Sequence, residues 1–195
     1  MLDPGVDDCD NTSTSRKDFS AVTNLGYQLF PVESTAAGLA AGSTDEFVSV
    51  GPPVLEVDAN ETLVVLKDIA YWSACTPPVP LSYLTSSDPN QPVNSVTLTM
   101  PSGTTAFVFE VLPYPVNTPY NVTTTFNDSK GGSTTSRQEV ENNQSAEGNA
   151  KLFGAYASGS LTIASIDIVT TLAGAPGPSF YLANMQISNT SRCIL

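Results

Sequence analysis

Two acidic residues stand inside runs of apolar residues, where a carboxylate could carry out acid–base chemistry. Glu110 interrupts the run from Ala106 to Leu112, and Asp167 interrupts the run from Ile163 to Ile168. Glycoside hydrolysis needs two carboxyl groups about 5–10 Å apart across a cleft, so an enzyme would pair Glu110 with Asp167 or with Glu139. We expect instead that Glu110 is satisfied by hydrogen bonds or by a basic neighbour, which a buried carboxylate requires if it is to stay charged.

The chain contains no histidine. This absence excludes Ser-His-Asp and Cys-His nucleophilic sites and imidazole metal sites. Calcium could find oxygen ligands in the group Asp7, Asp8, Asp10 and Asn11, but that group lacks the glycine and the distant glutamate of an EF-hand loop. We interpret it as a solvated acidic segment. The sequence therefore predicts no catalytic residue, no metal site and no cofactor, and hence a protein that is not an enzyme.

Aromatic residues in predicted loops suggest a second kind of chemistry. Sugar rings stack on exposed aromatic faces, while their hydroxyl groups need amide and carboxylate partners. Trp72, Tyr83 and Tyr114 flank loops, and asparagines occur nearby in the sequence. A glycan-binding site formed by these three residues is one interpretation, and packing in the core explains Trp72 equally well.

Three cysteines are too few for a scaffold held together by disulfides, and an odd number leaves at least one thiol free or paired with another chain. Cys9 and Cys193 lie near the two ends of the chain, which suits a disulfide between them or a covalent bond to a neighbouring subunit. Cys75 could equally be a small buried residue. The disulfide candidates are therefore Cys9 and Cys193.

The net charge of the chain limits the kinds of molecule that it can bind. The 195 residues include seven basic and nineteen acidic side chains, for a net charge of −12, which opposes binding to nucleic acid or to an anionic membrane. The longest uncharged apolar stretch, Leu63 to Leu66, is far too short to span a bilayer. The first ten residues are acidic and lack the apolar run of a secretory signal peptide. We expect no nucleic acid partner and no membrane insertion.

The elements that must position these residues are strands. Apolar and polar residues alternate over 95–100, 120–126 and 181–187, which is typical of half-buried strands. The runs 106–112 and 161–169 are apolar at successive positions and indicate central strands or strands near a bulge. Proline and glycine clusters separate these segments. The pattern predicts an all-β fold, an antiparallel β-sandwich of jelly-roll type.

The first part of the chain differs in character and predicts an extended N-terminal arm over residues 1–45, followed by the β-sandwich domain over 46–195. Residues 7–18 carry no apolar face. The segment from Phe19 to Pro31 is more apolar and could join a sheet edge of a neighbouring subunit as an added strand. Its candidate contact residues are Phe19, Val22, Leu25, Tyr27, Leu29 and Phe30.

The C-terminal two thirds of the chain resembles β-sandwich domains of bacterial surface and secreted proteins whose function is unassigned. The resemblance rests on residues 95–100, 106–111 followed by Pro113, 153–156, 165–168 and 180–185. The closing strand, 180–185, is also similar to the last strand of galactose-binding-like carbohydrate-binding modules, in which an acidic residue commonly stands near the position of Asn184. The resemblance implies a jelly-roll fold and exposure at a surface.

Together these features predict a structural subunit of an extracellular or virion assembly, such as a filament, coat or decoration. The arm would join each jelly-roll domain to its neighbours in a homo-oligomer. The supporting features are a polar arm, few basic residues, cysteines near both ends of the chain, strands rich in serine and threonine, and the absence of predicted catalytic residues. The alternative is a carbohydrate-binding or adhesion module of a surface protein, with glycans as partners. Either interpretation places the protein on an extracellular surface or a virion.

Overall fold

The computed structural model describes residues 2–5, 30–31, 44–50, 55–67, 82–86, 92–113, 118–141, 150–177 and 179–189. Every regular element among these residues is a strand. The strands are β1 (Leu2–Gly5), β2 (Phe30–Pro31), β3 (Thr44–Val50), β4 (Leu55–Lys67), β5 (Ser82–Ser86), β6 (Ser95–Thr99), β7 (Ala106–Pro113), β8 (Tyr120–Asp128), β9 (Ser133–Val140), β10 (Lys151–Ala157), β11 (Ile163–Leu172), β12 (Ala175–Pro176) and β13 (Phe180–Ser188).

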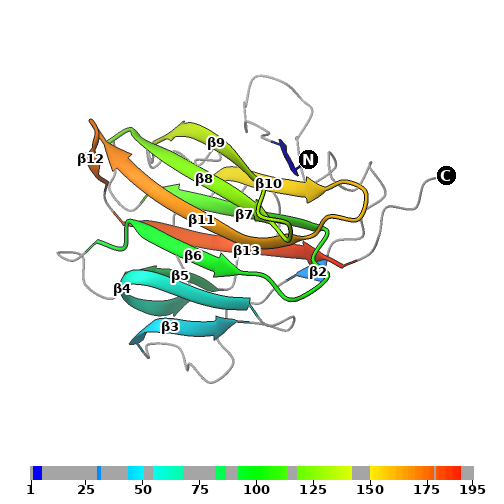
Figure 1. Cartoon of the computed structure of the whole chain (residues 1–195). Coiled ribbons are helices and arrows are strands. Elements are labelled where there is room, and N and C mark those ends of the chain that lie inside the picture. The colour runs from blue at the N-terminus through cyan, green and yellow to red at the C-terminus, as the bar shows by residue number, and fades with distance from the viewer. Residues whose placement is uncertain are drawn as a thin grey trace, which may run out of the picture.

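The strands form two layers, which Figure 1 shows one in front of the other. The β7 layer has the order β1-β10-β7-β13-β5, and the β11 layer has the order β6-β11-β8-β9. The long strand β4 belongs to both, because its residues 56–59 pair with β6 and its residues 63–67 pair with β5. Every pairing is antiparallel, so the predicted antiparallel β-sandwich is confirmed.

The chain crosses between the layers repeatedly, which gives the sandwich its jelly-roll character. It passes from β6 to β7, from β7 to β8, from β9 to β10, from β10 to β11 and from β11 to β13, and each step changes layer. Among the described strands from β6 onward, the hairpins β8–β9 and β11–β12 stay within one layer, and β3, β4 and β5 also pair with their neighbours in the chain. Neighbours in space are therefore often distant in sequence, and the sites on each face combine residues from separate parts of the chain.

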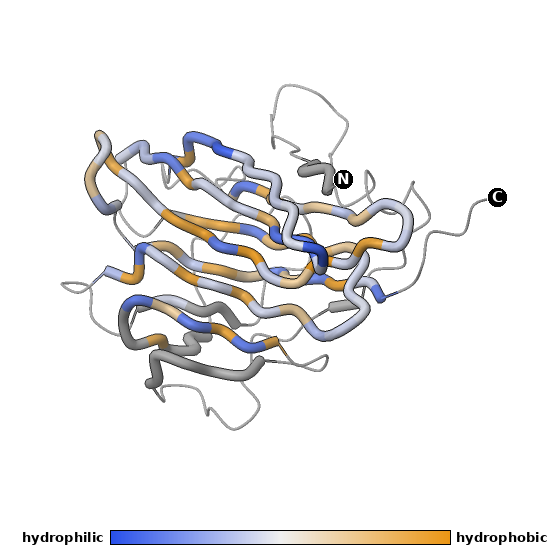
Figure 2. Tube along the Cα trace, in the orientation of Figure 1, coloured by the Kyte–Doolittle hydropathy of each residue, from blue (hydrophilic) through white to orange (hydrophobic). Residues whose placement is uncertain are grey.

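The core lies between the layers and consists of the inward-facing residues of each strand. Tyr120, Val122 and Phe126 alternate with half-buried polar residues along β8, and Figure 2 shows the same alternation in hydropathy along the β11 layer. Phe109 stacks on Phe153 with ring centroids 5.7 Å apart. Burying large apolar side chains stabilises such a core by about 1.5–3 kcal/mol each.

The strand β7 is buried on both of its faces, which explains why its sequence lacks alternation. Phe109 and Val111 face the core between the layers, while Val108 and Leu112 point to the other face of the β7 layer and are also buried. In β11 a register shift between Ile163 and Ser165 marks a bulge. Both predictions made from runs of successive apolar residues, a central strand and a strand near a bulge, are confirmed.

The described residues of the predicted arm pair with strands of the same chain. β1 pairs with β10, and β2 pairs with β13. Of the candidate arm residues, Phe30 lies in β2; Phe19, Val22, Leu25, Tyr27 and Leu29 lie outside the described residues. The division of the chain at residue 45 stays a prediction, and β3 spans it while pairing with β4.

A tight turn between β8 and β9 holds the hairpin. The backbone N–H groups of Lys130 and Gly132 both donate to Oδ1 of Asp128, over 2.7 and 2.9 Å. Gly131 has a φ of 85°, a left-handed conformation that favours glycine. The two backbone hydrogen bonds, that of Lys130 first, stabilise the carboxylate and lower the pKa of Asp128 below its usual value of 3.8.

This turn predicts a pH dependence of stability. The lowered pKa of Asp128 means that its charged form contributes stability above the unfolded pKa, and that this contribution is lost as the pH falls through the folded pKa. We expect Asp128→Asn to be less stable than the wild type in urea denaturation at pH 7, and the difference to shrink as the pH falls below the usual value of 3.8. A difference that does not change with pH would contradict the assignment.

Candidate binding face

The outer face of the β11 layer carries polar side chains from neighbouring strands in aligned rows. The strand register places three residues directly opposite one another in its central row: Thr97 of β6, Asp167 of β11 and Thr125 of β8. The row extends to Asp58 of β4 and Thr135 of β9. A parallel row contains Glu56, Thr99, Ser165, Asn127 and Ser133. All of these side chains are half-buried or exposed, so the face is open to solvent over five strands.

Asp167 is the centre of a hydrogen-bond network on this face. Oδ1 of Asp167 accepts from the Thr97 hydroxyl at 2.8 Å, and Oδ2 accepts from Nδ2 of Asn127 at 2.9 Å. Nδ2 of Asn127 also lies 3.0 Å from Oγ of Ser165. The carboxylate is therefore held in one orientation by side chains from both neighbouring strands. An ionised carboxylate has about four acceptor positions, so Asp167 can accept further hydrogen bonds from a ligand.

Two further features complete the face. Nε of Arg137 donates to Oδ1 of Asn121 at 3.1 Å, which holds the guanidinium over β8. Val169, one alternation along β11 from Asp167, is 37% exposed and lies between Ser95 and Thr123 in the register. The face thus combines fixed hydrogen-bonding groups with an exposed apolar side chain.

The electrostatics of this face are negative. Glu56, Asp58, Asp167 and Glu139 contribute carboxylates, whereas Arg137 contributes a positive charge. The whole chain carries a net charge of −12. The face can offer acceptors to neutral hydroxyl groups, and it repels an anionic ligand.

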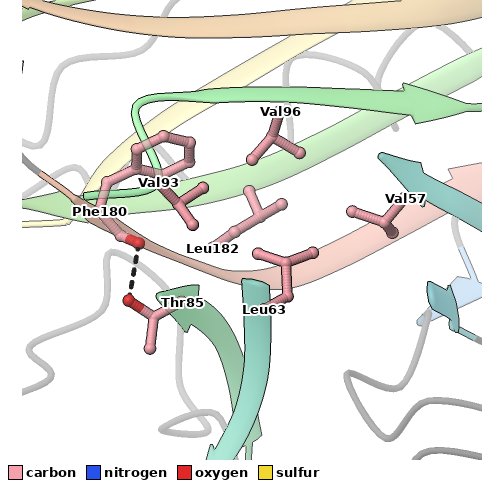
Figure 3. A pocket seen from close by; sticks show the side chains of 7 residues that line it. All are labelled: Val57, Leu63, Thr85, Val93, Val96, Phe180 and Leu182. Carbon is pink, nitrogen blue, oxygen red and sulfur yellow. Dashed lines mark hydrogen bonds between the residues drawn. The ribbon is translucent and has the colours of Figure 1, made fainter. Parts of the chain in front are cut away.

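The cavity in Figure 3 cannot serve as a ligand site. It has a volume of about 10 Å³ and lies where β4 bridges the two layers. Apolar side chains line it apart from Thr85, whose hydroxyl donates to the carbonyl oxygen of Phe180 at 3.1 Å. This volume is at the lower limit for a single water molecule, and a water needs polar partners that an apolar lining does not offer.

The second acidic candidate, Glu110, lies on the opposite outer face of the sandwich. It points away from the core on β7, is fully buried, and accepts a hydrogen bond from Nδ2 of Asn184 at 2.8 Å. Asn184 has a φ of 49° and lies in a bulge of β13 between Ala183 and Gln186. Asparagine tolerates this left-handed conformation better than most residues. The prediction that hydrogen bonding satisfies Glu110 is confirmed for this contact.

The candidate carboxylate pairs do not assemble. Glu110 and Asp167 project outward from different layers, with the core between them. Glu139 is exposed on the outer face of the β11 layer, on the same side as Asp167, so the core also separates it from Glu110. Neither pair can therefore face one cleft, as the two carboxyl groups of a glycosidase must.

Of the residues predicted from sequence for glycan binding or for disulfides, the structure describes Tyr83. Trp72, Tyr114, Cys9, Cys75 and Cys193 lie outside the described residues. Tyr83 is in β5, where its backbone pairs with Leu66. Within the described ranges, no group of acidic or cysteine side chains is arranged to hold a metal ion, and no helix is long and apolar enough to cross a membrane.

Sequence reasoning missed the outer face of the β11 layer as a site. The signal was present, because Thr97, Asn127 and Asp167 all occupy outward positions of alternating strands. Each of them is separated from the others by at least 30 residues in the chain. Only the strand register shows that they meet.

The sequence matches no protein-family model and is not significantly similar to any curated protein. Similar solved structures include the CBM22-1 xylan-binding domain of Xyn10C from Paenibacillus barcinonensis, with a TM-score of 0.44 and 11% identity over 83% of this chain and 94% of that one. The family 29 carbohydrate-binding module CBM29-2 has a TM-score of 0.37 and 10% identity over 86% of this chain and 96% of that one.

A third similar structure is the enzymatically active domain of tailspike protein 4 from bacteriophage CBA120. Its TM-score is 0.35 at 10% identity, and the match covers 69% of this chain and 19% of that one. At 10–11% identity these are likenesses of strand arrangement, and they do not say what this chain binds.

Because of the contact between Glu110 and Asn184, we expect substitutions at these two positions to lower the free energy of unfolding by different amounts. Glu110→Gln should lower the free energy of unfolding by about 1 kcal/mol, because an amide oxygen can still accept from Asn184. Asn184→Ala should cost more, about 2–4 kcal/mol, because it removes a donor from a buried carboxylate and places a less tolerant residue at positive φ. Urea denaturation of both variants measures these costs. An Asn184→Ala variant as stable as the wild type would show that the contact contributes nothing.

Proposed function

We propose that this chain is a carbohydrate-binding module of an extracellular or virion-exposed protein, and that the outer face of the β11 layer holds a neutral polysaccharide. The observation that carries the proposal is the Asp167 carboxylate, which Thr97 and Asn127 hold in one orientation on an open face. A group that is already ordered loses little freedom when a ligand binds. Sugar hydroxyl groups are the natural donors to such an acceptor.

The rest of the face supports the same ligand class. Threonine, serine and asparagine side chains surround Asp167 and can both donate and accept hydrogen bonds. Val169 offers an apolar contact for the C–H face of a sugar ring. The excess of carboxylates disfavours anionic polysaccharides. Since the described part of this face carries no aromatic platform, a single site should bind weakly, with a Kd of about 1 mM.

The proposed role is binding without turnover. Neither candidate carboxylate pair meets the spacing that hydrolysis requires, because Glu110 lies on the outer face of the β7 layer, whereas Asp167 and Glu139 both lie on the outer face of the β11 layer. Incubation with a bound polysaccharide should therefore release no reducing ends.

The test of this proposal uses Asp167→Ala. Affinity gel electrophoresis against neutral polysaccharides such as xylan, mannan and soluble cellulose should show retarded migration of the wild type by at least one of them. The variant should bind that polysaccharide about tenfold or more weakly, because it loses acceptors that are ionised and pre-ordered. Asp128→Asn is the matched control, since it removes a carboxylate that is engaged in its own turn.

Two outcomes would contradict the proposal. One is the absence of binding to every neutral polysaccharide tested. The other is a polysaccharide that binds with the same affinity after Asp167→Ala, provided that the variant keeps the wild-type melting temperature. If only an anionic polysaccharide retards the protein, the inference that the negatively charged face disfavours anionic ligands is also wrong.

A second candidate function, a subunit of an assembly, is favoured by the pairing of β1. Leu2–Gly5 form an outermost strand of the β7 layer, where they pair with β10. A segment of this kind can be exchanged between copies, because the same backbone hydrogen bonds form with the β1 of a neighbour. The arm would then link subunits, as the polar composition of the first residues also suggests.

Deleting residues 1–31 tests this candidate. Light scattering after size-exclusion chromatography should show the full chain in a species larger than a dimer. The deletion variant should form nothing larger than a dimer, because the exchanged strand is gone. A deletion variant that assembles like the full chain would reject exchange of the arm.

A further inference from the structure

We propose that two copies of this chain associate through the outer edge of β9 to form a symmetric dimer with one continuous β11 layer. β9 ends the strand order of its layer and, within the described ranges, pairs only with β8. Figure 1 shows it at the margin of the layer. β1 lies close to β9 but pairs with β10. An outermost strand of this kind exposes backbone donors and acceptors that another strand can use.

The turn sets which residues of β9 present their backbone at this edge. The N–H of Asp128 donates to the carbonyl oxygen of Gly132 at 2.8 Å. In an antiparallel ladder, hydrogen-bonded pairs alternate with non-hydrogen-bonded pairs. Counting from the turn, Ser136 and Gln138 are the residues whose backbone bonds to β8. The backbone groups of Arg137 and Glu139 therefore face away from β8, towards a second copy.

Charge complementarity identifies that second copy as the occupant. When two β9 strands pair antiparallel about a two-fold axis at Gln138, Arg137 of each copy lies directly opposite Glu139 of the other. The pairing joins their outward-facing backbone groups and brings opposite charges together twice. Both side chains are exposed, and neither forms an ion pair within the described part of the chain. Opposite charges directly across two strands stabilise the pairing.

Other registers are penalised by the same side chains. An axis at Arg137 places two guanidinium groups opposite each other. An axis at Glu139 places two carboxylates opposite each other and moves Arg137 opposite Glu141, which lies beyond the end of β9. Like charges across a strand pair are destabilising. Charged residues on an edge strand usually oppose association, but only the axis at Gln138 pairs Arg137 with an acidic residue that itself lies within β9.

Gln138 adds a second observation. Its Nε2 is buried and has no hydrogen-bond partner, although a buried amide donor normally has one. In the proposed register Gln138 lies opposite its own copy in a non-hydrogen-bonded pair, the arrangement that brings side chains closest. Two amide groups placed in this way can donate to each other.

The dimer would extend the outer face of the β11 layer. A two-fold axis perpendicular to the sheet keeps both outer faces on the same side, so the rows through Asp167 continue towards the second copy. If the proposed polysaccharide function holds, the two weak sites of the dimer would bind the same polysaccharide molecule and gain avidity. The dimer itself is inferred from β9 alone and does not rest on that function.

Charge reversal of the full-length protein tests the register. Sedimentation equilibrium should show the wild type dimerising, and Arg137→Glu or Glu139→Arg should each weaken dimerisation by about tenfold or more, because two attractive pairs become repulsive. An equimolar mixture of the two variants should form a heterodimer, since each carries two like charges that match the other. The double variant with both changes should dimerise like the wild type. Glu56→Arg, on β4 at the far side of the layer, is the control and should not alter dimerisation.

Hydrogen exchange gives an independent readout. The backbone amides of Arg137 and Glu139 should exchange more slowly at concentrations where the protein is dimeric than in the Arg137→Glu variant. A wild-type protein that stays monomeric at high concentration would overturn the proposal. So would a dimer whose affinity is unaffected by both single reversals. Loss of polysaccharide binding with an intact dimer would refute only the proposed function.

Discussion

The structure depends on one constraint, the alternation of side chains along strands that form a single core. Each inward residue that packs between the layers, such as Phe126 on β8 or Ile166 on β11, forces its neighbours to point outward. In the β11 layer these outward neighbours include hydroxyl, amide and carboxyl groups as well as the exposed Val169. The same packing that stabilises the sandwich therefore builds the polar face, because adjacent strands share one register.

The strand β4 makes this arrangement possible. It is long enough to pair with β6 at its start and with β5 at its end, so it connects the two layers through hydrogen bonds rather than through a loop. The register that β4 transmits to β6 aligns Asp58 with Thr97 and thus with Asp167. A shift of one residue at this strand would turn its polar residues towards the core.

The two outer faces have opposite characters. The outer face of the β7 layer is buried around Val108, Leu112 and Ala183, and its carboxylate, Glu110, is tied to Asn184 at a bulge. The outer face of the β11 layer is open, and its carboxylate, Asp167, is held but accessible. Two acidic residues that look alike in sequence thus have different surroundings: Glu110 is buried beside a bulge, and Asp167 is only half-buried on an open face.

The sequence alone was enough to predict the all-β sandwich and the central position of β7, because both follow from local alternation and from the absence of alternation over 106–112. It also predicted that Glu110 would be hydrogen-bonded, since burial of a carboxylate demands it. It could not reveal the network around Asp167. Thr97, Asn127 and Asp167 meet only because β6 and β8 flank β11, and strand order depends on packing between distant segments. The position of β9 as the outermost described strand of its layer was equally hidden, because a strand carries no local mark of having one neighbour instead of two.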